Sequence, residues 1–176
     1  MRFTRSQLPG TVIVDVEGHV DDRGLFGRTF CETEFEAAGL PTRFVQSSVS
    51  YNTRRGTLRG LHYQAVPKAE GKLVRCTHGA IHDVVVDLRP SSAGFLRWMS
   101  VELTAKNYRA LYVPPGCAHG FQTLADGSEV LYLMTEFYAP ELARGVRWND
   151  PIFGVEWPIV APTLSERDAT YPDFQP

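Results

Sequence analysis

Glycine and proline interrupt this chain along its whole length, and their spacing restricts its fold more than any other feature. The 176 residues include 12 prolines and 15 glycines, and the runs between them are short and rich in Val, Ile, Leu, Tyr and Phe. Such runs favour many short strands over long helices. We predict strands at Thr11–Val16, Phe44–Tyr51, Thr57–Gln64, Lys72–Thr77, Ala80–Leu88, Phe95–Leu103, Arg109–Val113, Phe121–Leu124 and Val130–Tyr138.

Helical signals are few and short. Glu32–Ala38 is stopped by Gly39, Pro140–Arg144 is stopped by Gly145, and a C-terminal turn begins at Ser165. About nine strands joined by tight turns predict an all-β fold, either closed or built from two antiparallel sheets. A jelly roll is favoured over an immunoglobulin-like sandwich. No repeat, low-complexity tract or linker divides the chain, so we expect residues 1–176 to form a single domain.

Charge and cysteine content exclude several classes of function. The net charge of −2 comes without a basic stripe, which argues against binding of nucleic acid. No run approaches the roughly 18 apolar residues of a membrane span, and the first ten residues lack the apolar core of a signal peptide. Three cysteines without a CxxC pattern indicate free thiols in a reducing compartment. We therefore expect a cytoplasmic protein.

The predicted strand Val130–Tyr138 has two different faces. Because side chains alternate along a strand, Tyr132, Met134, Glu136 and Tyr138 share one side, and Leu131, Leu133 and Phe137 share the other. The apolar side needs a cover, either the opposing sheet or another subunit. The side that mixes polar and aromatic groups is typical of a ligand cavity, although strand tyrosines also serve in packing alone.

Two histidines stand in patterns that suggest a site. Residues 114–121, PPGCAHGF, place His119 in the P-x-G-x-x-H spacing of the second cupin motif. In metal cupins that histidine works with an H-x-H pair, but here the pair reads His62-Tyr63-Gln64. Two imidazoles and an amide are a poor site for zinc or iron, which take three or more protein ligands. A jelly roll without a metal therefore fits better than a metalloenzyme.

A histidine such as His62 in a cavity can act as a general base, because its pKa lies near neutral pH. Such a base usually needs an orienting carboxylate, and Asp168 and Asp83 are both candidates. A structural histidine bound to a backbone carbonyl explains the spacing equally well. Isolated basic side chains could bind phosphate or lie solvated at the surface. They are Arg23, Arg59, Lys72, Arg75 and Arg89.

Taken together, these segments resemble the dTDP-4-dehydrorhamnose 3,5-epimerase family over nearly the whole chain. The matching runs are DRGLF at residues 22–26, LRGLHYQ at 58–64, GKLVR at 71–75, DVVVDLR at 83–89, PPGCAHGF at 114–121, WNDP at 148–151 and WP at 157–158. The resemblance implies a cupin-type jelly roll without a metal. It implies an epimerase that inverts C3, C5 or both in a nucleotide-linked 4-keto-6-deoxyhexose.

The resemblance also assigns chemical roles to individual residues. His62 would be the base that removes a proton next to the ketone, with Asp168 as its carboxylate partner. Tyr132 would return a proton from the opposite face of the sugar ring, and Lys72 would stabilise the enolate between the two steps. No cofactor is required, since the ketone itself acidifies the neighbouring C–H bond.

Further positions match contacts with the substrate. The implied substrate-binding set is Arg23, Arg28, Gln46, Ser48, Arg59, Lys72, His119, Tyr138 and Arg167, with Tyr138 stacked on the nucleotide base. The resemblance also implies a homodimer in which N-terminal residues reach the site of the partner.

The chain departs from the family at several of these positions. Arg28 replaces a glutamate, Ser48 replaces an asparagine and Leu133 replaces a lysine, while Glu136 and Ala143 stand where other residues are usual. A charge reversal beside a ligand costs about 1.5–3 kcal/mol when it removes a charged hydrogen bond. Three alternatives therefore remain: an epimerase for one centre only, an enzyme for a CDP-linked dideoxy sugar, and a cupin that binds nucleotide sugars without catalysis.

Strict alternation of side chains along a strand conflicts with part of the site that the resemblance implies. In the predicted strand Thr57–Gln64, Arg59 and His62 fall on opposite sides, yet the resemblance places both at the ligand. A bulge or twist at Gly60 would remove the conflict, because glycine inside a strand often marks one.

Overall fold

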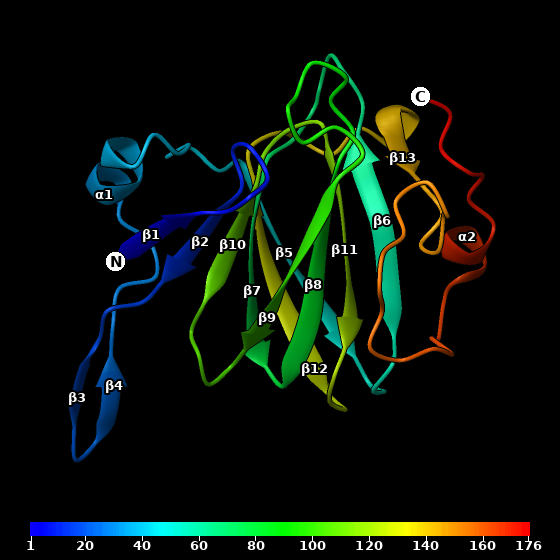
Figure 1. Ribbon diagram of the computed structural model, residues 1–176. Coiled ribbons are helices and arrows are strands. Elements are labelled where there is room, and N and C mark those ends of the chain that lie inside the picture. Colours follow the sequence, from blue (N-terminus) through cyan, green and yellow to red (C-terminus); the bar gives the residue numbers. More distant parts are fainter.

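Two antiparallel sheets packed face to face form the body of the protein (Figure 1). The structure is a computed structural model and describes residues 1–176. The first sheet has six strands in the order β1, β2, β10, β7, β12, β5. These strands span Arg2–Arg5, Val12–Asp15, Ala110–Val113, Lys72–His78, Ser128–Met134 and Gln46–Asn52 respectively.

The second sheet has five strands in the order β13, β6, β11, β8, β9. They span Ala143–Gly145, Leu58–Gln64, Cys117–Thr123, Ala80–Asp87 and Trp98–Thr104. Successive strands alternate between the sheets from β5 to β8, and again from β9 to β12. Alternation of this kind makes a jelly roll and not an immunoglobulin-like sandwich. The predicted antiparallel jelly roll is confirmed.

The remaining elements lie outside the two sheets. Strands β3 (His19–Asp21) and β4 (Gly24–Phe26) form a hairpin that extends away from the body (Figure 1). Helix α1 (Glu32–Ala37) and helix α2 (Glu166–Ala169) are short, as expected from the sequence. No helix in the chain is both long and apolar enough to cross a membrane.

Three apolar clusters hold the layers together. The largest has 13 buried residues, all from the two sheets except Leu8, and fills the space between the sheets; Val74, Val85 and Phe121 are among its members. A second cluster places Phe35 of α1 against the outer face of the six-stranded sheet. A third covers the outer face of the five-stranded sheet and includes Val84. Strand β8 is thus buried on both faces, which explains its continuous apolar run.

Several predicted boundaries were wrong. Strand β12 ends at Met134, four residues before the predicted end at Tyr138, because the backbone N–H and C=O groups beyond it bond to side chains and loops instead of a ladder. Strand β11 begins at Cys117 and not at Phe121. The helix predicted at Pro140–Arg144 is a 3₁₀ turn, η1 (Pro140–Leu142), which runs directly into β13. The short strands β1, β3, β4 and β13 were not predicted, because three or four residues are too few to show the alternation of a strand.

The predicted irregularity at Gly60 is present. On β11, His119 pairs with His62 and Phe121 pairs with Arg59, so two steps on β11 correspond to three steps on β6. This extra residue is a β-bulge, and it turns Arg59 and His62 to the same side. Gly60 has a φ of +132°, and a Cβ there would lie 2.5 Å from the Cα of Gly120. Only glycine fits this position.

Candidate active site

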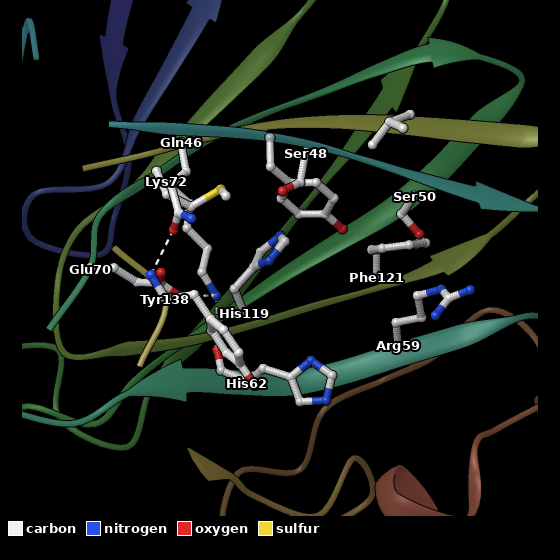
Figure 2. A pocket seen from close by; sticks show the side chains of 13 residues that line it. Gln46, Ser48, Ser50, Arg59, His62, Glu70, Lys72, His119, Phe121 and Tyr138 are labelled. Atoms are coloured by element: carbon white, nitrogen blue, oxygen red, sulfur yellow. Dashed lines mark hydrogen bonds and ion pairs between the residues drawn. The ribbon is translucent and has the colours of Figure 1, made fainter. Parts of the chain in front are cut away.

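A cavity of about 520 Å³ opens between the two sheets. One wall is β5, from which Gln46, Ser48 and Ser50 point toward Arg59 and His62 on β6 (Figure 2). Strand β12 and the start of β7 continue the wall of β5, and β11 lies beside β6 on the facing sheet. The other lining residues are Val49, Glu70, Lys72, His119, Phe121, Tyr132, Met134 and Tyr138. Seven of the positions predicted to form a site therefore lie around one cavity with His62, while Asp168 lies behind it.

His62 is bound to a buried carboxylate. Its Nε2 lies 2.6 Å from Oδ1 of Asp168, and the backbone N–H of Gly60 lies 3.4 Å from Oδ2. Asp168 is held in turn by Ser165, whose Oγ caps helix α2 by accepting the N–H of Asp168. Burial would raise the pKa of the Asp168 carboxyl, but the hydrogen bond and charge of His62, together with the hydrogen bonds from Gly60 and Ser165, lower it. The His62 side chain keeps 39% of its surface exposed.

His119 has a carboxylate partner of its own. Its Nε2 lies 2.9 Å from Oδ1 of Asp83, and both side chains are almost completely buried. Oδ2 of Asp83 has no hydrogen-bond partner. Of the two carboxylates considered for His62, Asp168 is therefore the one in contact, and Asp83 serves the second histidine.

Lys72 lies at the base of the cavity at the start of β7. Its Nζ lies 3.2 Å from Oε1 of Glu70 and 3.4 Å from the backbone carbonyl of His62. Only 12% of each side chain in the Glu70–Lys72 pair is exposed. The ammonium is therefore fixed beside the strand that carries His62.

Tyr132 lies on β12, in the sheet that faces His62 across the cavity. Its ring meets His119 edge to face, with 6.0 Å between the ring centres. Burial raises the pKa of the Tyr132 hydroxyl well above its usual value of 10; the charge on Asp83 adds to this shift and Arg59 opposes it. At neutral pH the phenol is protonated, as any tyrosine is, and burial disfavours its ionisation further.

Hydrogen bonds to neighbouring side chains hold two of the other lining residues in place. Nε of Arg59 donates to Oδ1 of the buried Asn52 at 2.7 Å. Oε1 of Gln46 accepts the backbone N–H of Tyr138 at 2.6 Å. The Tyr138 ring is more than half exposed at the cavity mouth, where it can stack on a planar group.

A smaller cavity of about 210 Å³ adjoins the first and shares His62, Glu70, Lys72 and Tyr138 with it. Arg167, from α2, and Arg144, from β13, complete its lining together with Tyr63, Gln64 and Ala143. Arg167 lies over the ring of Tyr171, 5.7 Å from its centre. Tyr171 is the main reason that the pKa of Arg167 is raised. This predicted site residue is a cation beside the main cavity.

Gln64 has a different task from the metal ligand that it replaces in the cupin pattern. Its Nε2 donates to the carbonyls of Lys68 and Phe137, and its Oε1 accepts the N–H of Ala139. The amide therefore fixes the segment that carries Tyr138. No group of three or more His, Cys, Asp or Glu side chains is placed to hold a metal ion.

Two of the predicted substrate contacts lie elsewhere in the chain. Arg23 is on the projecting hairpin and pairs with Asp21, and Arg28 pairs with Glu34 of α1 at 3.1 Å. Neither arginine lines the cavity. Among the departures from the family pattern, Ser48 does line the cavity, while Leu133 packs on the outer face as predicted. Glu136 was expected to share the face of Tyr132 but is not among the lining residues, because β12 ends before it.

Two residues of the site, Asn52 and Glu70, were not predicted from the sequence. Asn52 falls at the end of β5, where the predicted strand ended one residue earlier, and its contact with Arg59 depends on the pairing of β5 with β12. Glu70 precedes Lys72 by two positions, so it shares a face with it in extended chain. That spacing is a signal from which Glu70 could have been found.

A half-exposed imidazole backed by a carboxylate, a protonated phenol on the facing sheet and an ammonium beside them can move protons on and off a carbon acid. The imidazole can remove a proton, the ammonium can stabilise the resulting oxyanion and the phenol can donate a proton from the other side.

Comparisons with known proteins agree with this chemistry. The family model for dTDP-4-dehydrorhamnose 3,5-epimerase matches residues 5–176. The dTDP-4-dehydrorhamnose 3,5-epimerase of Pseudomonas aeruginosa is 45% identical over 170 residues, which cover 96% of this chain and 93% of that protein.

Solved structures extend the similarity to the fold. The dTDP-4-dehydrorhamnose 3,5-epimerase of Bacillus anthracis, crystallised with TDP and PPi bound, superposes with a TM-score of 0.95 at 39% identity and covers 98% of this chain and 99% of that one. A 3′-monoepimerase from Streptomyces bikiniensis in complex with dTDP-quinovose gives a TM-score of 0.89 at 34% identity, over 96% of this chain and 85% of that one.

Proposed function

This chain belongs to the dTDP-4-dehydrorhamnose 3,5-epimerase family, and from that membership we propose the reaction of its cavity. The enzyme is a sugar-nucleotide isomerase that inverts C3 and C5 of a dTDP-linked 4-keto-6-deoxyhexose. One observation carries the proposal: His62 with its carboxylate and Tyr132 with its protonated hydroxyl lie on facing sheets of a single cavity.

His62 is the base in this reaction. With the Nε2–H donated to Asp168, the ring presents Nδ1 as its basic nitrogen, and the carboxylate stabilises the imidazolium that forms. The proton comes from C3 or C5, the carbons on either side of the 4-keto group. Partial exposure of His62 supports this role, because the base has to reach the substrate and later release its proton.

Lys72 and Tyr132 complete the inversion. Removal of the proton leaves an enolate, and the Lys72 ammonium stabilises the charge on its oxygen. The Tyr132 hydroxyl is protonated at neutral pH and lies on the facing sheet, so it donates to the carbon from the face opposite His62. Return of the proton on the opposite face inverts the centre. The ketone supplies the acidity, and the reaction needs no cofactor.

The nucleotide end of the substrate is bound by the other lining residues. Arg59, fixed by Asn52, is placed for a bidentate contact with phosphate, and Arg167 adds a second cation. Tyr138 stacks on the base at the cavity mouth. Gln46, Ser48 and His119 offer hydrogen bonds to the sugar and its linker.

The N-terminal hairpin supports a homodimeric enzyme. Val20 and Phe26 of β3 and β4 are 75% and 82% exposed, and the hairpin projects from the body (Figure 1). Exposed apolar side chains on a projecting arm favour insertion into a second copy, which would carry Arg23 and Arg28 toward the partner's cavity. Each protomer of this dimer is a single domain of residues 1–176. It acts in the cytoplasm, as predicted from three cysteines that lack a CxxC pattern and are read as free thiols.

Deuterium exchange tests the reaction directly. We expect the purified protein, incubated with dTDP-4-keto-6-deoxyglucose in D₂O, to give a product that carries deuterium at C3 and C5 by NMR. The CDP-linked analogue serves as the matched control for the nucleotide. Absence of deuterium at both carbons with both substrates would contradict the proposal and leave a protein that only binds nucleotide sugars.

A single-centre epimerase is the second candidate, because the chain is also similar to a 3′-monoepimerase and because Ser48 departs from the family within the cavity. The same NMR experiment separates the two. Deuterium at C3 alone, with C5 unlabelled after complete turnover, identifies the 3-epimerase.

A further inference from the structure

Glu70 is the only carboxylate among the residues that line the main cavity. A carboxylate in the wall of a site for an anionic nucleotide sugar works against binding through charge repulsion, so its presence requires a compensating use. Its only charged partner within 4 Å is Lys72, at 3.2 Å (Figure 2).

The backbone fixes Glu70 and Lys72 on the same face. They stand two residues apart, and Gly71 between them points the other way, where a Cβ would lie 2.8 Å from the Tyr112 hydroxyl. The N–H of Gly71 donates to Oγ1 of Thr135, and its carbonyl accepts the N–H of Thr135. These two bonds tie the segment to the end of β12, so both side chains are directed into the cavity.

The contacts of the Lys72 ammonium define its direction. An ammonium group has three N–H donors. Glu70 and the carbonyl of His62, at 3.4 Å, engage two of them from two sides of the cavity base. The third donor is left for a ligand. Without the Glu70 carboxylate, a flexible four-carbon side chain would have only the long contact to His62 to orient it.

We propose that Glu70 is a positioning residue for the epimerisation: its carboxylate orients the Lys72 ammonium so that one donor meets the oxygen of the enolate. This inference rests on the proposed function of the cavity. Glu70 acts through Lys72 and does not touch the reacting carbons. Because orientation matters most when charge develops on the enolate, its loss lowers kcat more than it changes KM.

The experiment is a double-mutant cycle with Glu70→Gln, Lys72→Met and the double variant. We expect Glu70→Gln to lower kcat by about 10-fold to 100-fold, with KM within about threefold of the unmodified enzyme. In the Lys72→Met background the same change should alter kcat by no more than about twofold. Glu36→Gln removes an exposed carboxylate on α1 and serves as the matched control, with kcat unchanged.

Two results would overturn the inference: an unchanged or higher kcat in Glu70→Gln, or an equal fall in both backgrounds. Urea unfolding measures the ion pair without substrate in the four proteins of the cycle: the unmodified protein, the two single variants and the double variant. The change in the free energy of unfolding caused by Glu70→Gln should be severalfold smaller in the Lys72→Met background. Coupling in unfolding without any turnover by the unmodified protein would refute the proposed function alone. Absence of coupling in an active enzyme would refute the role of Glu70 alone.

Discussion

Two histidines that line the cavity, His62 and His119, are each paired with an aspartate behind it, with similar geometry and different surroundings. His62 and Asp168 are 2.6 Å apart, and His119 and Asp83 are 2.9 Å apart. His62 keeps 39% of its side chain exposed, whereas the His119 side chain is 4% exposed and Asp83 is fully buried. The two histidines therefore differ in how far solvent and substrate can reach them. His62 can exchange a proton with a substrate, whereas His119 mainly stabilises the structure.

The two pairs also arise differently in the chain. Asp83 and His119 come from the neighbouring strands β8 and β11, so the sheet itself brings them together. Asp168 comes from α2, 106 residues after His62, and reaches the histidine only because β6 bulges at Gly60 and α2 packs beside it. The first pair belongs to the core of the fold, and the second is added at its edge.

The largest expected effect is that of His62→Asn on activity. Loss of a general base costs about 100-fold to 10,000-fold, so we expect kcat to fall within that range. The melting temperature should fall less than in His119→Asn, because the gap left by His62 is open to solvent. Steady-state kinetics and thermal unfolding measure the two quantities. A variant that retains more than about a tenth of the activity would remove His62 from the role of base.

The matching change in the other pair is His119→Asn, and its main effect is on stability. It leaves the buried Asp83 without its partner, and loss of one member of a buried pair costs about 3 kcal/mol or more. Urea unfolding measures this cost, and deuterium exchange per folded molecule should fall less than in His62→Asn. Equal stability of the two histidine variants would break the distinction between the pairs.

Asp168→Asn is expected to lower kcat by about 100-fold, since the ring of His62 loses the carboxylate that orients it. The pH dependence of stability gives a second readout. Because the folded-state pKa of Asp168 is below the ordinary 3.8, its contribution to stability is complete above that pH and is lost as the pH falls through the folded-state value.

Unfolding curves at several acidic pH values check this sign. The unmodified protein should lose stability more steeply than Asp168→Asn as the pH drops below about 3.8. Parallel curves for the two proteins would show that the carboxylate is not stabilised by His62.

The smallest expected effect is that of Gln64→Glu on substrate binding. The new carboxylate would face the carbonyls of Lys68 and Phe137, so the segment that holds Tyr138 should loosen and KM should rise about fivefold, with little change in kcat. Gln122→Glu is the matched control, because Gln122 makes equivalent bonds to Ile159 away from the cavity. A similar rise in KM in both variants would mean that the effect is general destabilisation.

Much of this arrangement could be predicted from the sequence, and the failures have physical causes. Short strands between glycines and prolines predicted the jelly roll, because the side-chain alternation of a strand and the residues of a turn can be recognised within a short stretch of sequence. The bulge at Gly60 followed from a conflict between strand alternation and the resemblance. The end of β12 could not be predicted in this way. The backbone N–H groups of Tyr138 and Ala139 donate to Gln46 and Gln64, which lie on other strands, and no local sequence pattern indicates these contacts.

Charged residues were harder to place than strands. Arg28 was expected at the substrate, but within its own chain it pairs with Glu34. The contact between Lys72 and Glu70 was not predicted, although the spacing of two residues permits it. A sequence gives the face of a side chain in a strand, but the partner of a long, flexible ion depends on the tertiary structure.

Tyr132→Phe tests most directly whether the base and the donor lie on opposite faces of the substrate. With His62 intact, the variant should still exchange the C3 and C5 protons for deuterium in D₂O. The deuterium should, however, be added to the same face from which the proton was removed. We therefore expect labelled substrate and little or no epimerised product by NMR. Full inversion by Tyr132→Phe at a rate near that of the unmodified enzyme would contradict the assignment of Tyr132 as the proton donor.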